Sequence, residues 1–433
     1  MNSHSKKAGL LSILFMGLGQ FYNRQFAKGL FLALIELVYI IFLSPFLAHG
    51  LWGIATLGET PQKMAGSKIV QGDHSIYLMV LGIISVILIF IFALFYVINF
   101  HDARLVGKRR DEGGQPNGLM DSLHVLTEKG FPYIMLIPAI VFTLFLTAVP
   151  LLFGILIAFT NYSSPNHLPP RSLVSWVGLG TFMDLFGLKS WKNTLIGVGL
   201  WTIVWAVFST LTSFFAGMVM AAFLNSNGVK LKKFWRTVFI IPWAVPGFIA
   251  IMIMRNIFNT QFGPLNQYLA SLNLGGIPWL TQATWAKIVC IIVNMWFGMP
   301  YFMALMSGVM TGIPKDMYEC AEVEGAGGFY RFRKITVPMV MFATAPLLIM
   351  SFAYNFNNFS LIYLLTVGDP VNNNYAFAGN TDILLSWIYK LTLERQQYNL
   401  ASAVSIIVFV VIATVSMFSF SRSRSFKEED MMR

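Results

Sequence analysis

The sequence predicts an all-α polytopic membrane protein with about eight transmembrane helices, and its composition and long uncharged stretches support this. Of the 433 residues, 56% are hydrophobic and only 11% are charged, and the mean hydropathy is +0.66. Soluble domains carry about 25% charged residues. Residues 76–100, 133–160 and 335–367 contain no charge, and about 20 apolar residues suffice to cross a bilayer. Only Cys290 and Cys320 are present, which excludes a disulfide-stapled class.

Eight spans follow from hydropathy, and two of them carry irregular features. The first span contains Glu36, which we expect to make an interhelical hydrogen bond or to lie at a boundary of the span, and the fifth is interrupted by Pro242 and Pro246. Membranes tolerate such breaks where neighbouring helices or a water-filled cavity satisfy the backbone. The apolar stretch at 8–18 is too short to cross a membrane, and we expect a turn at 19–23 to lead from it into the first span. We interpret this stretch as an interfacial or re-entrant lead-in, and we expect no cleavable signal peptide. The expected spans are 27–48, 76–100, 132–160, 193–224, 237–258, 286–311, 338–366 and 400–420.

The distribution of Lys and Arg predicts that both termini are cytoplasmic. Of 30 such residues, 21 fall in segments placed inside by eight spans, and only seven fall in outside loops. Basic residues favour the cytoplasmic side of membrane proteins. This bias explains the basic pI of about 9.6 without any role in binding nucleic acid. The cytoplasmic set is Lys6, Lys7, Arg24, Lys28, Arg104, Lys108, Arg109, Arg110, Lys129, Lys230, Lys232, Lys233, Arg236, Lys315, Arg331, Arg333, Lys334, Arg422, Arg424, Lys427 and Arg433.

The chain divides by content into an accessory region at 1–130 and a working core at 131–433. The first part holds two spans and a charged, glycine-rich linker at 107–118. Motifs for phosphate binding (G-x-x-x-x-G-K-[ST]), zinc hydrolysis (H-E-x-x-H), paired C-x-x-C and the G-x-S-x-G elbow do not occur. We therefore predict no catalytic residue, no metal site and no bound cofactor. The core spans lack central acidic residues, which argues against an ion-coupled secondary transporter.

Uncharged polar and aromatic residues share helical faces in the sixth and seventh spans. The first face is Asn294, Phe297, Gly298 and Tyr301, and the second is Ser351, Tyr354, Asn355 and Asn358. Amides and phenols pair with sugar hydroxyls, so these faces suit a neutral, hydroxyl-rich ligand. Packing between helices through small and amide residues explains the same pattern equally well.

The segment at 312–337 is the second candidate site. Residues 314–323 are predicted to form a helix that Gly325, Gly327 and Gly328 would end, and Phe329 and Phe332 follow among basic residues. A short amphipathic helix with such a turn suits docking into a groove of another protein. The alternative is a solvated loop that lies along the membrane.

This segment resembles the cytoplasmic signature of membrane subunits of ABC importers. Glu319, Ala321, Gly325, Ile335 and Pro338 stand at the matching positions, while Cys320 and Val337 replace Ala and Leu. Residues 131–433, with IPWAVP at 241–246 and NFNNF at 355–359, resemble the larger permease subunit of maltose/maltodextrin importers. The resemblance implies a type I permease core of six helices, preceded here by two N-terminal helices.

The resemblance also implies residue roles and partners. Substrate would contact Asn294, Phe297, Gly298, Tyr301, Ser351, Tyr354, Asn355 and Asn358, with Phe297 and Tyr354 standing where a relative has Leu and Phe. Coupling to an ATPase would use Glu319, Ala321, Gly325, Ala326, Phe329, Ile335 and Pro338. Implied partners are a second homologous permease in a heterodimer, two ATPase subunits that use ATP-Mg, and an extracellular sugar-binding lipoprotein.

The expected function is import of oligosaccharides, most specifically maltose or maltodextrin, through a bacterial cell membrane. The loop at 161–191 is short where some relatives insert a large domain, which favours a Gram-positive envelope. Binding-protein contacts are expected at 161–191, 259–285 and 368–399. Galactan-derived and multiple-sugar permeases are the competing identities. A secondary transporter and a membrane-embedded glycosyltransferase are the other classes.

Overall fold

Among the described residues of the computed structural model, regular secondary structure is helical apart from two three-residue strands, in agreement with the predicted all-α membrane class. The structure describes residues 4–65, 68–118, 120, 124, 127–128, 130–168, 172–226 and 228–421. Within them, seven helices are long and apolar enough to cross a membrane, or eight with one bent pair counted as a span. The predicted number of spans is therefore confirmed. Lys129 and the four basic residues counted after Ser421 lie outside the described residues.

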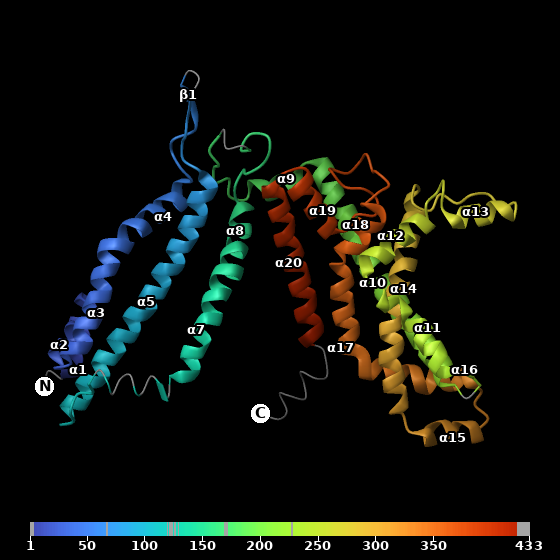
Figure 1. Cartoon of the computed structure of the whole chain (residues 1–433), viewed down its shortest axis with the longest axis horizontal. Helices are drawn as coiled ribbons and strands as arrows, with labels where there is room; N and C mark the ends of the chain where they lie inside the picture. Colours follow the sequence, from blue (N-terminus) through green and yellow to red (C-terminus); the bar gives the residue numbers. More distant parts are fainter. Residues whose placement is uncertain are drawn as a thin grey trace. The chain divides into compact units, whose positions relative to one another are not determined.

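The contacts divide the chain into two units, Met1–Leu179 and Gly180–Arg433 (Figure 1). The third span therefore groups with the first unit, where α8 packs against α5. The functional division of the chain at residue 130 stays a prediction. The elements of the first unit are α1 (His4–Leu14), α2 (Leu18–Tyr22), α3 (Phe26–Val38), a π-helical turn (Tyr39–Leu43), α4 (Ser44–Thr56), β1 (Lys63–Ala65), β2 (Lys68–Val70), α5 (Ser75–Asp111), α7 (Phe131–Thr143), a π-helical turn (Leu144–Ala148) and α8 (Val149–Ile157).

The lead-in to the first span is a helical hairpin, α1 and α2, packed on the end of α5. The turn predicted at 19–23 is wrong, because those residues lie mostly in α2. The chain instead reverses before α2, at Gly17, whose φ of 90° favours glycine. Asn23 Nδ2 donates to the Ala103 carbonyl at 2.8 Å. The expected hydrogen bonding of Glu36 is confirmed, because its carboxylate accepts from the Met16 backbone N–H and lies 3.5 Å from the Tyr96 hydroxyl.

The second unit is built around α10 and α14, which pack along much of their length. It holds two hydrophobic clusters, of which one contains Phe214 and Phe302 and the other contains Trp205 and Val293. Its elements are α9 (Gly180–Gly187), α10 (Lys189–Asn225), α11 (Lys232–Ala244), α12 (Gly247–Ile257), α13 (Pro264–Ser271), α14 (Ala283–Thr311), α15 (Lys315–Val323), α16 (Gly328–Arg331), a π-helical turn (Phe332–Thr336), α17 (Val337–Phe356), α18 (Phe359–Thr366), α19 (Leu384–Tyr389), a π-helical turn (Lys390–Glu394) and α20 (Tyr398–Ser421).

Two predicted spans of this unit are broken in the middle. The fifth bends by 95° between α11 and α12, where Pro246 removes a backbone donor. The seventh was expected as one helix over 338–366, but α17 ends at Phe356 and α18 begins at Phe359. Asn358 is the N-cap of α18, and its Oδ1 accepts from the Leu361 N–H at 3.4 Å. Asn favours caps over helix interiors because its side chain competes for backbone hydrogen bonds. The prediction that Asn358 shares a helical face with Ser351 is therefore wrong.

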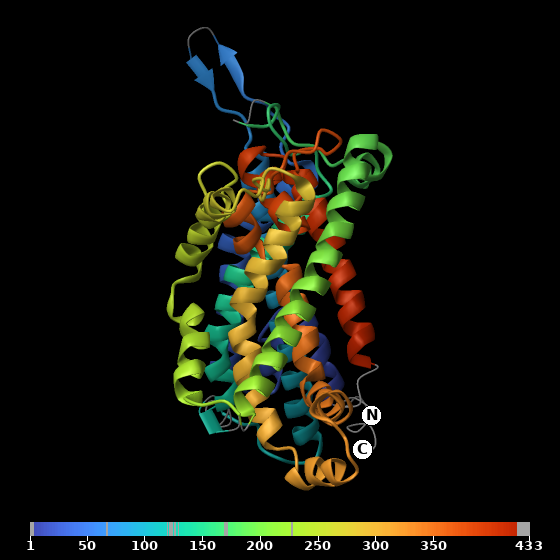
Figure 2. The same ribbon diagram turned by 90° about the vertical axis from the view of Figure 1, so that its right-hand side faces the viewer.

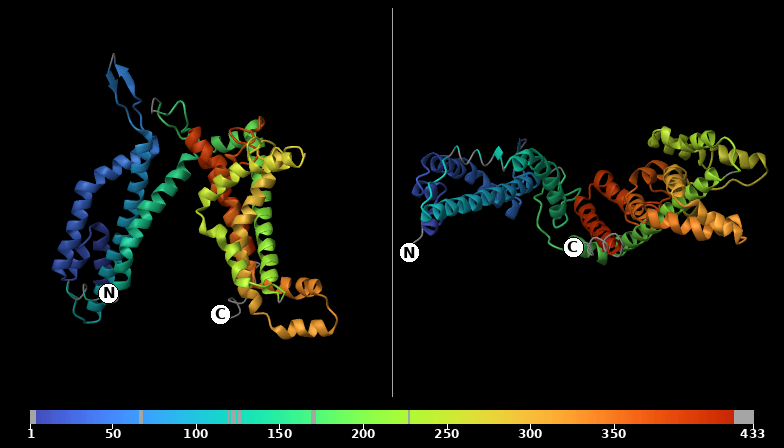
Figure 3. Two further views of the ribbon diagram at one scale, coloured as in Figure 1. Left: turned by 45° about the vertical axis from the view of Figure 1, so that its right-hand side comes forward. Right: turned by 90° about the horizontal axis from the view of Figure 1, so that it is seen from below.

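The second unit has two distinct ends. α13 and the α18–α19 loop lie at one end, and α15 lies at the other (Figures 1 and 2). α15 and its flanking turns project beyond the bundle of long helices (Figure 3, left). The candidate site residues thus fall in two places, at the broken helices and at the projecting segment.

Candidate functional site

A cavity of about 690 Å³ lies among the broken helices of the second unit. α10, α11, α12, α14, α17 and α18 all contribute to its wall. All eight residues predicted to contact substrate are part of that wall. They include Asn358, which caps α18 instead of continuing α17. The lining residues are Ser213, Trp243, Gly247, Phe248, Ile251, Asn294, Phe297, Gly298, Tyr301, Phe302, Leu347, Met350, Ser351, Tyr354, Asn355, Asn358, Ser360, Leu361 and Leu364.

The α14 side of the cavity is held close to α10 by a glycine. A Cβ atom on Gly298 would lie 2.6 Å from Ser213 Oγ, so a larger residue would push the two helices apart. One turn earlier, the buried Asn294 accepts at Oδ1 from Asn358 Nδ2 at 3.2 Å. This amide pair joins α14 to the start of α18. It places polar groups where the chain crosses from α17 to α18.

The α17 side of the cavity combines a packing residue with an exposed one. Asn355 is 3% exposed, and its Nδ2 donates to Thr210 Oγ1 at 3.0 Å. The backbone carbonyl of Asn355 accepts a hydrogen bond from Trp205 Nε1 at 2.8 Å. Asn355 thus fastens α17 to α10, as the interhelical reading of this face predicts. Tyr354 is 70% exposed and lines the cavity.

The cavity carries no formal charge. Among the described residues that line it, there is no Asp, Glu, Lys, Arg or His. Its polar groups are hydroxyls, amides and backbone atoms, and its apolar groups are mainly aromatic rings. Such a wall hydrogen-bonds neutral hydroxyl groups and covers apolar ring faces. It offers no counter-ion to a charged ligand.

The predicted docking segment is a capped helix followed by a tight turn. α15 begins after Pro314, as expected, and ends in a Schellman motif. The Ala326 N–H donates to the Ala321 carbonyl at 2.9 Å, and the Gly325 N–H donates to the Glu322 carbonyl at 2.9 Å. Gly325 has a φ of 82°, the left-handed conformation that this motif needs. The glycine at this position therefore sets the shape of the turn.

Side-chain contacts join the turn to the base of the segment. Glu322 and Arg331 form an ion pair at 2.5 Å, and the Tyr318 and Thr336 hydroxyl oxygens lie 2.9 Å apart. Ile335 packs against the hydrophobic cluster that contains Phe214 and Phe302. The other predicted coupling residues lie in α15, the turn, α16 and the start of α17: Glu319, Ala321, Gly325, Ala326, Phe329 and Pro338.

Comparison with known proteins assigns the chain to a family. Residues 213–424 match the family described as binding-protein-dependent transport system inner membrane component. The galactooligosaccharides transport system permease protein GanP of Bacillus subtilis is 39% identical over 98% of this chain and 99% of that protein. The chain therefore belongs to the family of binding-protein-dependent transport system inner membrane components. The maltodextrin transport system permease proteins MdxF of B. subtilis and MalC of Streptococcus pneumoniae are 38% and 37% identical over nearly the whole of both chains.

Solved structures with the same fold come from ABC transporters. A bacterial ABC transporter involved in the import of the acidic polysaccharide alginate has a TM-score of 0.56 at 23% identity, covering 69% of this chain and 97% of that one. The predicted resemblance to ABC importer permeases is confirmed. So is the expectation of a transport subunit rather than an enzyme, because the full-length relatives are permease proteins.

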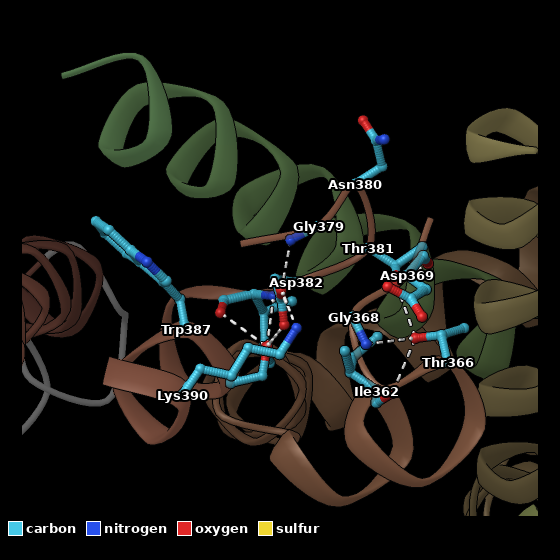
Figure 4. A network of polar contacts seen from close by, with 12 residues as sticks. Ile362, Thr366, Gly368, Asp369, Gly379, Asn380, Thr381, Asp382, Trp387 and Lys390 are labelled. Carbon is cyan, nitrogen blue, oxygen red and sulfur yellow. Dashed lines mark hydrogen bonds and ion pairs between the residues drawn. The ribbon is translucent and has the colours of Figure 1, made fainter. Parts of the chain in front are cut away.

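The permease has a third ordered feature, which the sequence did not predict. The segment between α18 and α20, which includes α19 and which we call the cap (residues 367–397), is organised around the fully buried Asp382 (Figure 4). Asp382 accepts from the Gly379 N–H, the Ser386 hydroxyl and Lys390 Nζ, each at 2.7 Å. Burial raises the pKa of Asp382, and the Lys390 ammonium counteracts this shift. Gly379 and Asp382 lie in the irregular chain before α19, where periodicity gives no signal, whereas Ser386 lies in α19 and Lys390 begins the π-helical turn after it.

The cap is fastened to the N-terminal half of α10. Trp201 Nε1 donates to the Thr381 carbonyl at 3.1 Å, and the Leu384 N–H donates to Thr202 Oγ1 at 2.9 Å. The cap therefore moves with α10 rather than as a free loop. Sequence reasoning also missed Trp243 and Phe248 in the cavity wall, because both flank the proline break in the fifth span. The IPWAVP stretch itself was the available signal.

Proposed function

We propose that this chain is one permease subunit of an ATP-driven importer of neutral oligosaccharides. The observation that carries the proposal is the uncharged cavity of amides and aromatic rings at the broken helices. An oligosaccharide has a rim of hydroxyls and apolar ring faces, and this wall complements both. Membership in a binding-protein-dependent transport family supports import as the direction.

The proposed substrates are maltodextrins, with galactooligosaccharides as the alternative. The two B. subtilis relatives carry these two names at nearly equal identity. Both substrates are neutral hexose chains, so the cavity chemistry accommodates either. The proposed hydroxyl contacts are Asn294, Tyr301, Ser351 and Asn358. Phe297, Gly298, Tyr354 and Asn355 would shape the wall.

The proposed partners complete a transporter around this chain. A second homologous permease would close the cavity from the other side. Two ATPase subunits would consume ATP-Mg, so this chain itself needs no cofactor. An extracellular sugar-binding lipoprotein would deliver substrate, and the family description supports a binding protein. A structural relative of this fold was solved in complex with an alginate pentasaccharide-bound periplasmic protein.

α15 and its turn are the proposed contact with the ATPase. Phe329 is 77% exposed and Val323 is 90% exposed in the projecting segment. Large exposed apolar groups on a structured loop mark a protein contact. Closure of the ATPase subunits on ATP would pull α15 and reorient the helices that carry the cavity. The coupling is a change between two packing arrangements rather than a side-chain reaction.

The proposed setting is the cell membrane with α15 and both termini on the cytoplasmic side. The excess of Lys and Arg in the segments placed inside supports this orientation. A Gram-positive envelope is proposed because Bacillus and Streptococcus relatives match along nearly their whole length. A Klebsiella aerogenes maltose/maltodextrin permease matches over only 49% of its length.

Uptake of labelled oligosaccharides tests the proposal. In a strain deleted for this gene, the restored chain should import maltotriose or a galactotriose only when the ATPase is intact. Uptake that persists without the ATPase would contradict it.

The cavity is tested by Asn358→Ser, which keeps an N-cap oxygen for α18 but removes the amide. Because a hydrogen bond to substrate would be lost, uptake at low sugar concentration should fall about tenfold. Asn357→Ser is the matched control, because Asn357 does not line the cavity and its amide bonds to the Ala353 carbonyl. Equal effects of the two changes would contradict a role of Asn358 in binding.

A further inference from the structure

The helical hairpin of α1 and α2 has a fixed place on α5, at the end of the first unit that lies away from β1 (Figure 1). The Asp111 carboxylate accepts from the His4 N–H at 2.7 Å and from the Ser5 N–H at 3.2 Å. Further along both helices, the Tyr96 hydroxyl donates to the Ile13 carbonyl at 3.0 Å. α1 therefore runs antiparallel to α5, from the end of α5 back along its span.

The exposed face of α1 changes from basic to apolar along its length. Lys7 is exposed in the first turns, whereas Leu10, Ile13 and Leu14 are 64%, 54% and 75% exposed. We call these three residues the apolar tip. A helix with this order of side chains suits the boundary between lipid headgroups and acyl chains.

α5 shows the same order beside α1. It has 37 residues and is about 55 Å long, so it extends several turns beyond the ~30 Å of hydrocarbon. Val97 and Ile98 are exposed near the level of the apolar tip, and exposed basic residues follow toward the end of the helix. We call the exposed basic residues of the two helices the basic band: Lys6, Lys7, Arg104, Lys108 and Arg109.

The basic band keeps an excess of positive charge. Among the residues that the structure describes, Lys7, Arg104 and Arg109 form no ion pair. Lys108 lies 4.0 Å from Glu112, but both side chains are more than 60% exposed, so solvent screens this pair. The Asp111 carboxylate is already occupied by the backbone N–H groups at the start of α1.

Arg104 is held at the seam between the two helices. Its guanidinium lies 5.5 Å from the centroid of the Phe100 ring. A Cβ atom on Gly9 of α1 would lie 2.7 Å from Arg104 Cγ, so the absence of a side chain at Gly9 makes room for the stem of the arginine. The hairpin therefore positions this charge, which a flexible tail would not do.

We infer that the basic band binds the headgroups of anionic phospholipids while the apolar tip lies among their acyl chains. Lys and Arg near a membrane surface attract anionic lipid, and their long stems let the charged groups reach the headgroups. The apolar tip buries its side chains in the same leaflet. This inference does not depend on which sugar is transported, so its failure would leave the proposed function in place.

Binding of a fluorescent phosphatidylglycerol to the full transporter in neutral detergent tests the inference, with phosphatidylcholine as the lipid without net charge. Lys7→Gln combined with Arg104→Gln removes two charges of the basic band. Lys230→Gln combined with Lys233→Gln is the matched control, because both residues are exposed and belong to the second unit, at the start of α11. Gly9→Ala displaces Arg104 without changing any charge.

The dissociation constant for phosphatidylglycerol should rise about twenty- to thirty-fold in the double variant of the basic band, at roughly fivefold for each basic residue. Gly9→Ala should raise it about fivefold, because one charge is displaced. Arg104→Lys, which keeps the charge, should stay within about threefold of wild type. The control pair should stay within about twofold, and phosphatidylcholine should bind every variant alike.

Four results would overturn the inference. Wild-type affinity for phosphatidylglycerol in the double variant would show that lipid does not touch the basic band. An equal loss in the control pair would show that any exposed cation serves. Displacement of the lipid by millimolar inorganic phosphate would assign the band to phosphate in solution. Normal lipid binding with weakened binding of the ATPase would assign the band to that partner. Should Gly9→Ala fail to assemble, the double variant still decides, because it changes only exposed side chains.

Discussion

The turn after α15 depends on one backbone conformation, and Gly325→Ala tests that dependence directly. Gly325 has a φ of 82°, and an added Cβ would meet no atom of this chain within 4 Å. The substitution therefore introduces backbone strain without a clash inside the chain. A left-handed residue other than glycine costs about 1–2 kcal/mol. The equilibrium between capped and uncapped turns should shift roughly five- to thirty-fold toward the uncapped form.

The assay is binding of the purified ATPase to the permease in nanodiscs, followed by sugar uptake. Affinity for the ATPase should fall by up to the same factor, because only the capped turn presents α15 and Phe329 together. Gly327→Ala is the control: it is equally open and also near α15, but its φ of −64° suits any residue. It should bind the ATPase like wild type.

Gly325→Asn distinguishes strain from a clash with the partner. Asn tolerates the left-handed conformation better than Ala does, although its side chain is larger. Strain predicts that Asn binds the ATPase better than Ala, whereas a steric clash predicts the reverse order. Wild-type affinity in Gly325→Ala would refute the reasoning, and so would an equal loss in Gly327→Ala.

Two ion pairs of the second unit should differ greatly in importance. Asp382→Ala leaves the Lys390 ammonium, which is 11% exposed, without its carboxylate, so thermal unfolding should show a loss of about 3–5 kcal/mol. The double change Asp382→Leu with Lys390→Met should recover part of that loss, and no recovery would contradict the buried-charge explanation. Glu322→Gln breaks a pair whose carboxylate is 67% exposed, so solvent screens it and ATPase affinity should change by less than about threefold. A larger effect would mean that the ATPase itself contacts Glu322.

Hydropathy and charge predicted the number of spans because a bilayer imposes a length and polarity that sequence alone reveals. The two helix breaks were harder to predict. Pro242 and Pro246 were visible, but their sequence does not give a bend angle. The break at Asn357 depends on side chains that cap a new helix instead of continuing the old one. Periodicity therefore placed Asn358 on the wrong element while still bringing it to the right cavity.

The residues of the cavity were predictable to the extent that they lie on long regular helices. Asn294 and Tyr301 follow the spacing of α14, and the family resemblance singled them out. Trp243 lies beside a break, where helical spacing gives no register. The cap was not predictable for a related reason, because Asp382 itself lies in irregular chain before α19. The left-handed turn at Gly17 was likewise hidden, because several glycines nearby offered the same freedom.

The two helix breaks have a joint mechanical consequence. α12 packs on α18, and short non-helical junctions at Val245–Pro246 and at Asn357–Asn358 connect these two helices to α11 and α17. Both α12 and α18 share a hydrophobic cluster with α10 and α14, and the cap that follows α18 is fastened to α10, so these elements form one block. A tilt of α11 or α17 against this block would turn at the two junctions. Because residues beside both junctions line the cavity, such a tilt would change the shape of its wall.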